Sequence, residues 1–323
     1  MESPPFSLLS YGGGQDSVAI LHLYFNDREF RKKYAPNRLL VVLGATLNEH
    51  PETDEHVKTI KELCAKRGVE FIHVTPDYGF HSGAWSGGLL AQWSAHNTIG
   101  SAAYPKSCTV ALKTAPVWSA VEMVIERDFG FPAKSNKRGL RAYAEKYGKI
   151  PCIIGIAKGE ESRMAQKAVD PMMLPFDKKD GVKGPKKDPT PKWMLECVER
   201  IYPLVDIGFD RAAAQRYIAS VGEVVPPPSN CMACPYKSRE EVLWTQRKYP
   251  EFFAKWVALE AAKLKHWAGK VDDAGKPVPN YGVKGKQTLV EFHKEAVERH
   301  GHMTMQELDT YIFSHGHCVA SKH

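Results

Sequence analysis

Apolar residues gather in short runs along the first half of the chain, separated by longer stretches of mixed polarity. Runs rich in Val, Ile and Leu occur at residues 6–10, 39–46, 69–75 and 150–156. Strands of a parallel sheet are buried on both faces, so they show nearly continuous apolar segments rather than strict alternation. The pattern therefore predicts four parallel strands.

Between and after these runs, apolar residues recur at the spacing of a helix. The predicted helices cover residues 17–25, 53–67, 115–127, 191–201, 210–221 and 240–264. Strands that alternate with helices predict an α/β fold with a doubly wound, mainly parallel sheet. Residues 82–104, rich in Gly, Ser and Trp, predict a long loop or a broken helix beside a pocket.

The last third of the chain has no strong strand pattern, which predicts a helical C-terminal extension. Three consecutive prolines, Pro226, Pro227 and Pro228, interrupt the chain before a pair of cysteines. We therefore predict an α/β domain over residues 1–225 and a cysteine-bearing, mostly helical region over residues 226–323.

Composition narrows the classes of protein that remain. Of the 323 residues, 43% are hydrophobic and 25% are charged, which excludes a disordered or fibrous chain. The apolar stretches are far too short to cross a bilayer, and the N-terminus lacks the pattern of a secretory signal, so we expect no membrane partner. Seven cysteines, an odd number, favour reduced thiols over a disulfide framework. Together these observations predict a cytoplasmic protein.

Positive charge is concentrated in two segments, residues 134–149 and residues 177–192, although the formal net charge is only +7. We interpret both as basic insertions in the α/β domain. The second is rich in Gly and Pro and is diluted by aspartates. It is either a solvated surface insertion or a contact to a nucleic-acid backbone that becomes ordered on binding.

A glycine-rich turn joins the first predicted strand to the first predicted helix in the sequence SLLSYGGGQDSVAIL. Gly12, Gly13 and Gly14 let backbone N–H groups approach an anion closely, and the helix N-terminus adds donors and a favourable dipole. Ser17 can add a hydroxyl donor. Asp16 either caps the helix or holds a magnesium ion that bridges phosphates. The turn lacks the lysine of a Walker A loop and meets the dinucleotide fingerprint only in part.

The sequence GGGQDS resembles the SGGxDS signature of the PP-loop ATP pyrophosphatase superfamily, with Gly12 in place of the usual serine. The resemblance implies an adenine nucleotide alpha-hydrolase-like fold. It also implies that the chain binds ATP with Mg²⁺ and cleaves the bond between the α- and β-phosphates, which leaves AMP on a substrate.

Further segments are similar to one branch of that superfamily, the phosphoadenosine phosphosulfate reductase-like proteins. In chain order they are NEHPETDEHV at 48–57, SCTVALKTAP at 107–116, GIAKGEESRM at 155–164, YPLVDIGFD at 202–210 and NCMACP at 230–235. In the third segment the arginine follows the serine directly, which departs from the spacing of the branch. The resemblance covers residues 6 to about 260, and five elements in the expected order make a chance match unlikely.

The resemblance implies a nucleotide site, which we carry over residue by residue. Its catalytic residues are Asp16, Lys113 and Arg163, the last two as cations that meet phosphate or sulfate. Its nucleotide-binding residues are Ser10, Gly12, Gly13, Gly14, Gln15, Asp16, Ser17, Glu49, Gly155, Glu161 and Ser162. The competing interpretation is that Lys113 and Arg163 are ordinary surface charges. For the acidic residues after the second predicted strand, the alternative is that Glu52 and Thr53 simply start the next helix.

The cysteines fall into two groups. Cys64, Cys152 and Cys197 lie in helical or apolar segments and are expected to be small buried side chains. Cys231 and Cys234 form a C-x-x-C pair in a loop, where they can be redox-active, zinc-binding or cluster-binding.

The resemblance adds Cys108 as a partner of this pair, because some members of the branch bind a 4Fe–4S cluster with it. The predicted metal ligands are Cys108, Cys231 and Cys234, with Cys318 as the fourth ligand unless the fourth iron stays open. A zinc site is the alternative, built from Cys231, Cys234 and two of Cys108, His315, His317 and Cys318. The absence of any metal is the third interpretation.

We expect an enzyme that adenylates a substrate oxygen so that a sulfur nucleophile can replace it. Nucleic acid is the expected substrate, as in the DNA phosphorothioation and tRNA thiolation relatives, with a cysteine desulfurase as the sulfur-donor protein. A sulfonucleotide reductase is one alternative, in which Cys318 acts as the nucleophile. A non-catalytic nucleotide-binding accessory subunit is another. A homodimer stays open, because the sequence does not determine the oligomeric state.

Overall fold

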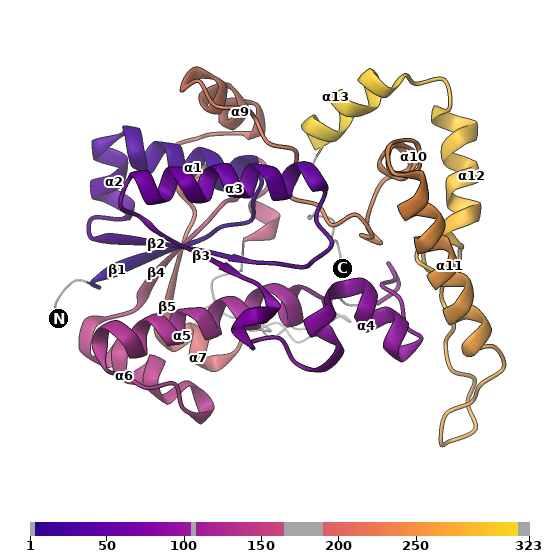
Figure 1. The fold of residues 1–323 in the computed structure, drawn as a ribbon, viewed down its shortest axis with the longest axis horizontal. Coiled ribbons are helices and arrows are strands. Elements are labelled where there is room, and N and C mark those ends of the chain that lie inside the picture. The colour runs from indigo at the N-terminus through magenta and orange to yellow at the C-terminus, as the bar shows by residue number, and fades with distance from the viewer. Residues whose placement is uncertain (1–3, 105–107, 165–189, 316–323) are drawn as a thin grey trace, which may run out of the picture.

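A computed structural model describes residues 4–104, 108–164 and 190–315 of the chain (Figure 1). A sheet of five parallel strands lies at its centre in the order β3-β2-β1-β4-β5. The strands are β1 (Phe6–Ser10), β2 (Arg38–Gly44), β3 (Glu70–Val74), β4 (Ile150–Ile154) and β5 (Val198–Ile201). The expected α/β class and parallel sheet are confirmed.

The strand order reverses between β1 and β4. The chain moves outward from β1 through β2 to β3, and then returns to the other side of β1 to form β4, where Ser10 pairs with Ile154. In open α/β sheets, the crevice at the carboxyl ends of the strands on either side of such a reversal is the usual place for a ligand. The glycine loop follows β1 directly and therefore lies at this point.

Helices cover both faces of the sheet, because successive side chains of each strand point to opposite sides. Leu9, Val41 and Ile153 belong to one core, and Leu8 and Leu40 belong to the other. The first core is covered by α1 (Gln15–Asn26), α2 (Arg28–Tyr34), α3 (Pro51–Lys66) and α9 (Arg211–Ser220). The second is covered by α5 (Ala115–Phe129), α6 (Arg138–Tyr147) and α7 (Lys192–Cys197).

Two of the predicted helices are corrected by the structure. The segment 191–201 is helical only as far as Cys197, and its remainder is the edge strand β5, which pairs with β4 from Val198 onward. A short apolar segment fits either element, and here pairing with a neighbouring strand decides. The segment 240–264 is divided into α10 (Arg239–Lys248) and α11 (Pro250–His266), because Pro250 supplies no backbone N–H.

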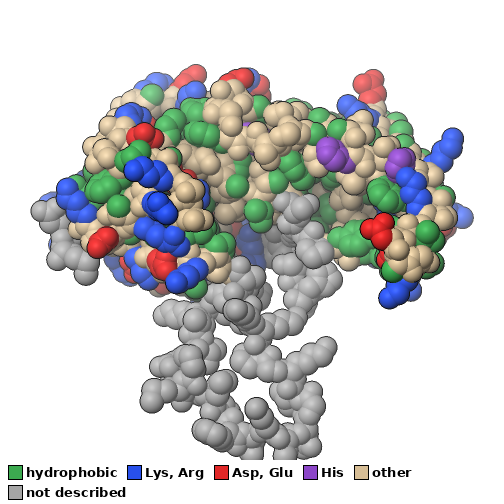
Figure 2. All heavy atoms as spheres, turned by 90° about the horizontal axis from the view of Figure 1, so that it is seen from below, with side chains coloured by type: hydrophobic (Ala, Val, Ile, Leu, Met, Phe, Trp, Pro, Cys, Tyr) green, Lys and Arg blue, Asp and Glu red, His purple; other side chains and the backbone are tan. Residues whose placement is uncertain are grey.

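The basic segment 134–149 contains a helix of the α/β domain. Leu140 and Tyr143 of α6 are buried in the core, while Lys134, Arg138 and Lys146 are exposed. Figure 2 shows this side of the molecule, where Lys and Arg side chains gather at the end that holds α6. Of the second basic segment, 177–192, only residues 190–192 lie within the described residues.

The C-terminal part is helical, as expected. In the described residues after β5, the named elements are α8 (Pro203–Asp206) and α9 to α13, including α12 (Leu289–His300) and α13 (Met305–His315). One further core joins this part to α4 (Gly88–His96), and another lies among the C-terminal helices themselves. The 3-10 turn Gly83–Gly87 precedes α4, so the two form the expected broken helix. The remaining short turns are Pro76–Tyr78, Thr109–Thr114, Ser135–Lys137 and Glu161–Arg163. None of the described helices has both the length and the apolar character needed to span a membrane.

Candidate functional site

The glycine loop connects β1 to α1 at the reversal point of the sheet. Gly13 has φ +74°, a left-handed conformation that glycine adopts without strain. The Ser17 hydroxyl donates to the Gly14 carbonyl at 2.9 Å and accepts from the Gly12 amide at 3.3 Å. The Gly14 carbonyl also accepts from the Val18 amide at 3.1 Å and begins the helix. The loop is thus closed on the first turn of α1, where backbone amides are available to an anion.

A polar cavity of about 180 Å³, which we call the phosphate cavity, opens over this loop. Nine of the site residues predicted from the sequence line this cavity: Ser10, Gly12, Gly14, Gln15, Asp16, Ser17, Lys113, Gly155 and Arg163. The other lining residues are Ile154, Arg211, Pro228, Ser229 and Asn230. Residues from the first, middle and last parts of the α/β domain therefore meet at one place.

Two glycines allow the walls of this cavity to approach each other. A Cβ atom at Gly155, after β4, would lie 3.1 Å from the Asp16 Cβ. A Cβ atom at Gly44, which ends β2, would lie 3.0 Å from the Lys113 Cα. Lys113 belongs to the π-helical turn Thr109–Thr114, so the missing side chain at Gly44 lets this turn lie against the sheet.

The charges in the phosphate cavity form a connected group. Arg163 and Arg211 each donate to the Glu160 carboxylate at 2.5 Å, and Arg211 Nη2 lies 3.9 Å from Asp16 Oδ2. Burial alone would raise the pKa of Glu160, but the two arginines outweigh burial and hold that pKa below its usual value. With Lys113, three cations face two carboxylates, which leaves a positive cavity suited to phosphate.

Asp16 does not cap helix α1. Gly14 occupies the N-cap of α1, which has no side-chain capping hydrogen bond. Among the described residues, the buried Asp16 Oδ1 has no hydrogen-bond partner. Burial raises the pKa of Asp16, while Arg211 opposes the shift and Glu160 adds to it. An unpaired buried carboxylate oxygen beside a phosphate cavity fits a hard divalent cation such as Mg²⁺.

Gln15 ties the glycine loop to the C-terminal part of the chain. Its Nε2 atom donates to the carbonyls of Pro226 at 3.0 Å and Phe313 at 3.4 Å, and its Oε1 atom accepts from Gln215 Nε2 at 2.9 Å. Phe313 belongs to α13, the last described helix. Cys318, the predicted fourth metal ligand, lies outside the described residues.

Three predicted nucleotide-binding residues, Gly13, Glu49 and Glu161, are not among the described residues that line the phosphate cavity. The Glu49 carboxylate accepts from the Thr46 amide at 2.9 Å and shapes the loop after β2. The Glu161 side chain is exposed and accepts from the Gly159 amide at 3.0 Å, which lowers its pKa. For Ser162 the structure describes only the backbone, in the short turn before residue 164.

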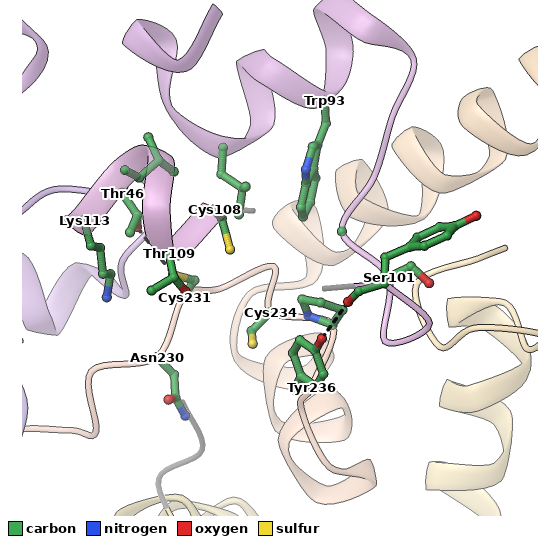
Figure 3. Close-up of a pocket in the computed structure, with 15 residues that line it drawn as sticks. Thr46, Trp93, Ser101, Cys108, Thr109, Lys113, Asn230, Cys231, Cys234 and Tyr236 are labelled. Carbon is green, nitrogen blue, oxygen red and sulfur yellow. Dashed lines mark hydrogen bonds between the residues drawn. The ribbon is translucent and has the colours of Figure 1, made fainter. Parts of the chain in front are cut away.

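A second, mainly apolar cavity of about 70 Å³ adjoins the first, and we call it the cysteine cavity (Figure 3). Cys108, Cys231 and Cys234 all line it, and Lys113 and Asn230 line both cavities. Its remaining lining residues are Thr46, Leu89, Trp93, Gly100, Ser101, Tyr104, Thr109, Leu112, Pro235 and Tyr236. The fold thus brings three predicted metal ligands together beside the phosphate cavity.

The C-x-x-C loop is held against the loop that follows β2. Glu49 and Cys231 form an isolated antiparallel bridge, and the Met232 amide donates to the Asn48 carbonyl at 2.8 Å. The Cys234 amide donates to the Cys231 carbonyl at 3.2 Å and closes the turn. Glu49 therefore contacts the cysteine loop through its backbone and the loop after β2 through its carboxylate.

Two lysines, Lys237 and Lys284, lie next to the loop that carries Cys231 and Cys234. Lys237 is only 3% exposed and donates to Thr245 Oγ1 at 2.8 Å. Lys284 donates to the carbonyls of Pro235 and Lys237, and burial lowers its pKa to about 8. The buried Glu241 carboxylate offsets part of this charge. Burial lowers the pKa of Lys237 as well, so negative groups nearby, such as Glu241 and the thiolates of Cys231 and Cys234, favour the charged form of this amine.

The cysteine cavity does not have the geometry of a single-ion site in the described residues. No three His, Cys, Asp or Glu side chains in 4–104, 108–164 and 190–315 form a group that could hold a metal ion. Zinc requires its sulfur and nitrogen ligands at about 2.0–2.3 Å from one point. Cys108, Cys231 and Cys234 share this cavity, whereas Cys318 and His317, two of the other candidate ligands, lie outside the described residues.

The remaining described cysteines are buried, as expected. Cys64 lies in α3, Cys152 in β4 and Cys197 in α7. Burial raises the pKa of the Cys64 and Cys152 thiols to about 12, so both are protonated at neutral pH. These three residues are packing groups of the core.

Several lining residues were not predicted. Arg211 directly follows the segment YPLVDIGFD, and Ser229 and Asn230 lie between the prolines and the first cysteine of the C-x-x-C pair. Their proximity to quoted segments was a signal, but no local pattern indicates that they reach the glycine loop. The segment GIAKGEESRM predicts Glu161 as a binding residue, whereas its neighbour Glu160 accepts hydrogen bonds from Arg163 and Arg211.

Comparison with known proteins identifies no relative from which a function could be inferred. No protein-family model matches the chain, and no curated protein sequence matches it. The arrangement of the phosphate cavity and the cysteine cavity is therefore the basis on which a function can be argued.

Proposed function

We propose that this protein is an ATP-dependent enzyme of the PP-loop type, with an adenine nucleotide alpha-hydrolase-like fold. It transfers AMP to a substrate oxygen, releases pyrophosphate, and so prepares that position for sulfur. The observation that carries the proposal is the shared wall of the two cavities. Lys113 and Asn230 face both the glycine loop and the three cysteines.

The phosphate cavity suits the charge of a triphosphate. The loop amides stand at a helix N-terminus, and Lys113, Arg163 and Arg211 surround them. A further cavity of about 280 Å³ shares Ser10, Gly12, Lys113 and Ile154 with it and has mainly apolar walls that include Tyr11, Trp118 and Met194. This cavity suits a nucleoside, so the pair offers room for both ends of ATP.

The first step is an in-line displacement at the α-phosphorus. A substrate oxygen attacks this atom, a new P–O bond forms, and the bond to the bridging oxygen of the β-phosphate breaks. Pyrophosphate leaves with that electron pair. Lys113 and the two arginines stabilise the charge that develops on the departing group, which is the main contribution a protein makes to phosphoryl chemistry. Asp16 would hold Mg²⁺, which neutralises phosphate charge when it is bound.

In the second step a sulfur nucleophile attacks the substrate atom that carries the adenylated oxygen. A bond from sulfur to this atom forms, its bond to that oxygen breaks, and AMP leaves with the oxygen. The proposed metal group is a 4Fe–4S cluster held by Cys108, Cys231 and Cys234, with Cys318 as the fourth ligand or with one iron open. Bound there, it would supply a site for sulfide. Lys237 and Lys284 support an anionic group at this place, because burial lowers the pKa of both amines and a nearby anion favours their charged forms.

A nucleic acid is the proposed acceptor, and a sulfur-donor protein such as a cysteine desulfurase is the proposed partner. The exposed cations of α6 and the segment before it support this choice, because they gather on one side of the molecule (Figure 2). Aromatic walls in the cysteine cavity, Trp93, Tyr104 and Tyr236, offer surfaces on which a base can stack.

The test uses anaerobically purified full-length protein with ATP, Mg²⁺, sulfide and pools of tRNA or DNA. We expect AMP and pyrophosphate in equal amounts, dependent on acceptor, and iron with acid-labile sulfide in the protein. Lys113→Ala should lose this activity, while Lys255→Ala, which removes an exposed lysine of α11, should keep it. No AMP or pyrophosphate with any acceptor rejects the proposal. Sulfite release from adenylyl sulfate would favour the reductase instead.

A further inference from the structure

The segment that follows the three prolines brings a serine hydroxyl onto the glycine loop. A Cβ atom at Gly14 would lie 2.8 Å from Ser229 Oγ and 3.0 Å from Ser229 N. A Cβ atom at Gly12 would lie 3.5 Å from the same oxygen. The Ser229 hydroxyl therefore occupies the space that side chains of the loop would fill, and Ser229 also lines the phosphate cavity.

Several hydrogen bonds fix the position of Ser229. Gln15 Nε2, at the start of α1, donates to the Pro226 carbonyl at 3.0 Å. The Asn230 amide donates to the Pro228 carbonyl at 2.8 Å, and Asn230 Nδ2 donates to the buried Glu241 carboxylate at 3.0 Å. Prolines on one side reduce the freedom of the segment, so little entropy is lost when its hydroxyl meets a ligand.

We propose that Ser229 is a phosphate-binding residue that supplies the loop, from a distant segment, with the hydroxyl that a glycine at position 12 cannot provide. This inference rests on the proposed function, since it takes the ligand to be the phosphate chain of ATP. The hydroxyl donates to a phosphate oxygen, while the loop amides donate to others. Gly14 is then required for a second reason, because any side chain there would displace Ser229.

The proposal predicts that the hydroxyl can be moved back into the loop. Gly12 is not among the residues with positive φ, and a Cβ atom there meets only Ser229 Oγ, at ordinary contact distance. A serine at position 12 therefore fits the backbone, and removal of the Ser229 hydroxyl gives it room. The two positions should be functionally exchangeable.

The experiment measures the affinity of the full-length protein for ATP with Mg²⁺ by calorimetry. Ser229→Ala should bind ATP about 10- to 100-fold more weakly, the loss expected for one hydrogen bond to a charged group. The double variant Ser229→Ala with Gly12→Ser should recover most of that loss. Ser220→Ala removes an exposed hydroxyl at the end of α9 and should bind as the unchanged protein does.

The outcomes separate this inference from the function on which it rests. If the unchanged protein binds no ATP, the proposed function fails and the role of Ser229 fails with it. If it binds ATP and Ser229→Ala binds equally well, only the role of Ser229 is rejected. If affinity falls but Gly12→Ser does not restore it, while thermal unfolding is unchanged, the hydroxyl is not exchangeable and the inference is overturned.

Discussion

Arg211 offers a direct test of the charge arrangement in the phosphate cavity. Its guanidinium contacts Glu160 at 2.5 Å and lies 3.9 Å from Asp16. The Arg211 and Glu160 side chains are 16% and 21% exposed, so water screens this pair only in part. Arg211→Met keeps much of the aliphatic stem and removes the charge, which leaves two carboxylates close together.

The expected loss of stability follows from burial and from the partners that remain. Removal of one partner from a fully buried ion pair costs about 3–5 kcal/mol. Arg163 still donates to Glu160 in the variant, and some water reaches the site, so we expect about 2–3 kcal/mol at neutral pH. Arg141→Met is a matched control, because Arg141 makes a similar bond to Glu196 with both side chains 38% exposed. Such surface pairs contribute less than about 1 kcal/mol.

The loss should depend on pH with a definite sign. The pKa of Glu160 is held below its usual value in the folded protein, so its ionised form contributes stability above that usual value, and the contribution is lost as the pH falls through the folded pKa. The pKa of Asp16 is raised by burial, and Arg211 opposes this rise. Without Arg211 both carboxyls become harder to ionise. The difference in stability between the variant and the unchanged protein should therefore be largest at neutral pH and shrink under acidic conditions.

Urea denaturation at neutral and at acidic pH measures this difference, and calorimetry with ATP and Mg²⁺ measures the effect on binding. We expect ATP affinity to fall at least tenfold in Arg211→Met and to remain unchanged in Arg141→Met. Equal losses of stability in the two variants, or a loss that grows as the pH falls, would refute the reasoning about the buried charge group.

Three further predictions test other parts of the site. Gly14→Ala should destabilise the fold by about 1–2 kcal/mol and weaken ATP binding, because a Cβ atom at this position would lie 2.8 Å from Ser229 Oγ. Gly12→Ala should leave the unfolding temperature nearly unchanged, because the same distance is 3.5 Å there. Cys231→Ser together with Cys234→Ser should reduce iron and labile sulfide in anaerobic protein to background while ATP affinity stays within a few-fold; full iron content in this variant contradicts the cluster assignment. Lys113→Ala should reduce pyrophosphate release by about 10- to 100-fold without a change in unfolding temperature, and activity equal to that of the unchanged protein excludes Lys113 from the reaction.

Much of the fold could be predicted because its signals are local. Each central strand is a short apolar run, since both faces of the sheet are covered, and the helices between strands show their own periodicity. The edge strand β5 was missed because Val198–Ile201 is short and follows a helical turn directly. Only its pairing with β4 distinguishes it from a continued helix.

The site could be predicted in part, for the same reason. The glycine loop is a local signal, because glycines between a strand and a helix leave the backbone amides accessible to an anion in any fold. Glu49 shows the limit of such signals. Its position after β2 suggested a ligand contact, but its carboxylate is occupied by the amides of its own loop. The sequence shows which polar group a residue carries, but only the folded structure shows which partner forms hydrogen bonds with that group.

The sequence by itself determined that the chain is an α/β protein with a glycine loop after its first strand and a C-x-x-C pair in a later loop. It also determined that three further cysteines are buried in the core. The tertiary structure decided which of these elements meet. Reversal of strand order at β1 and β4 opens the crevice. Return of the segment after Pro228 sets Ser229 against the loop and joins the cysteines to the phosphate cavity through Asn230. Contacts between segments so distant in the chain depend on how whole layers pack, and no local pattern of residues encodes them.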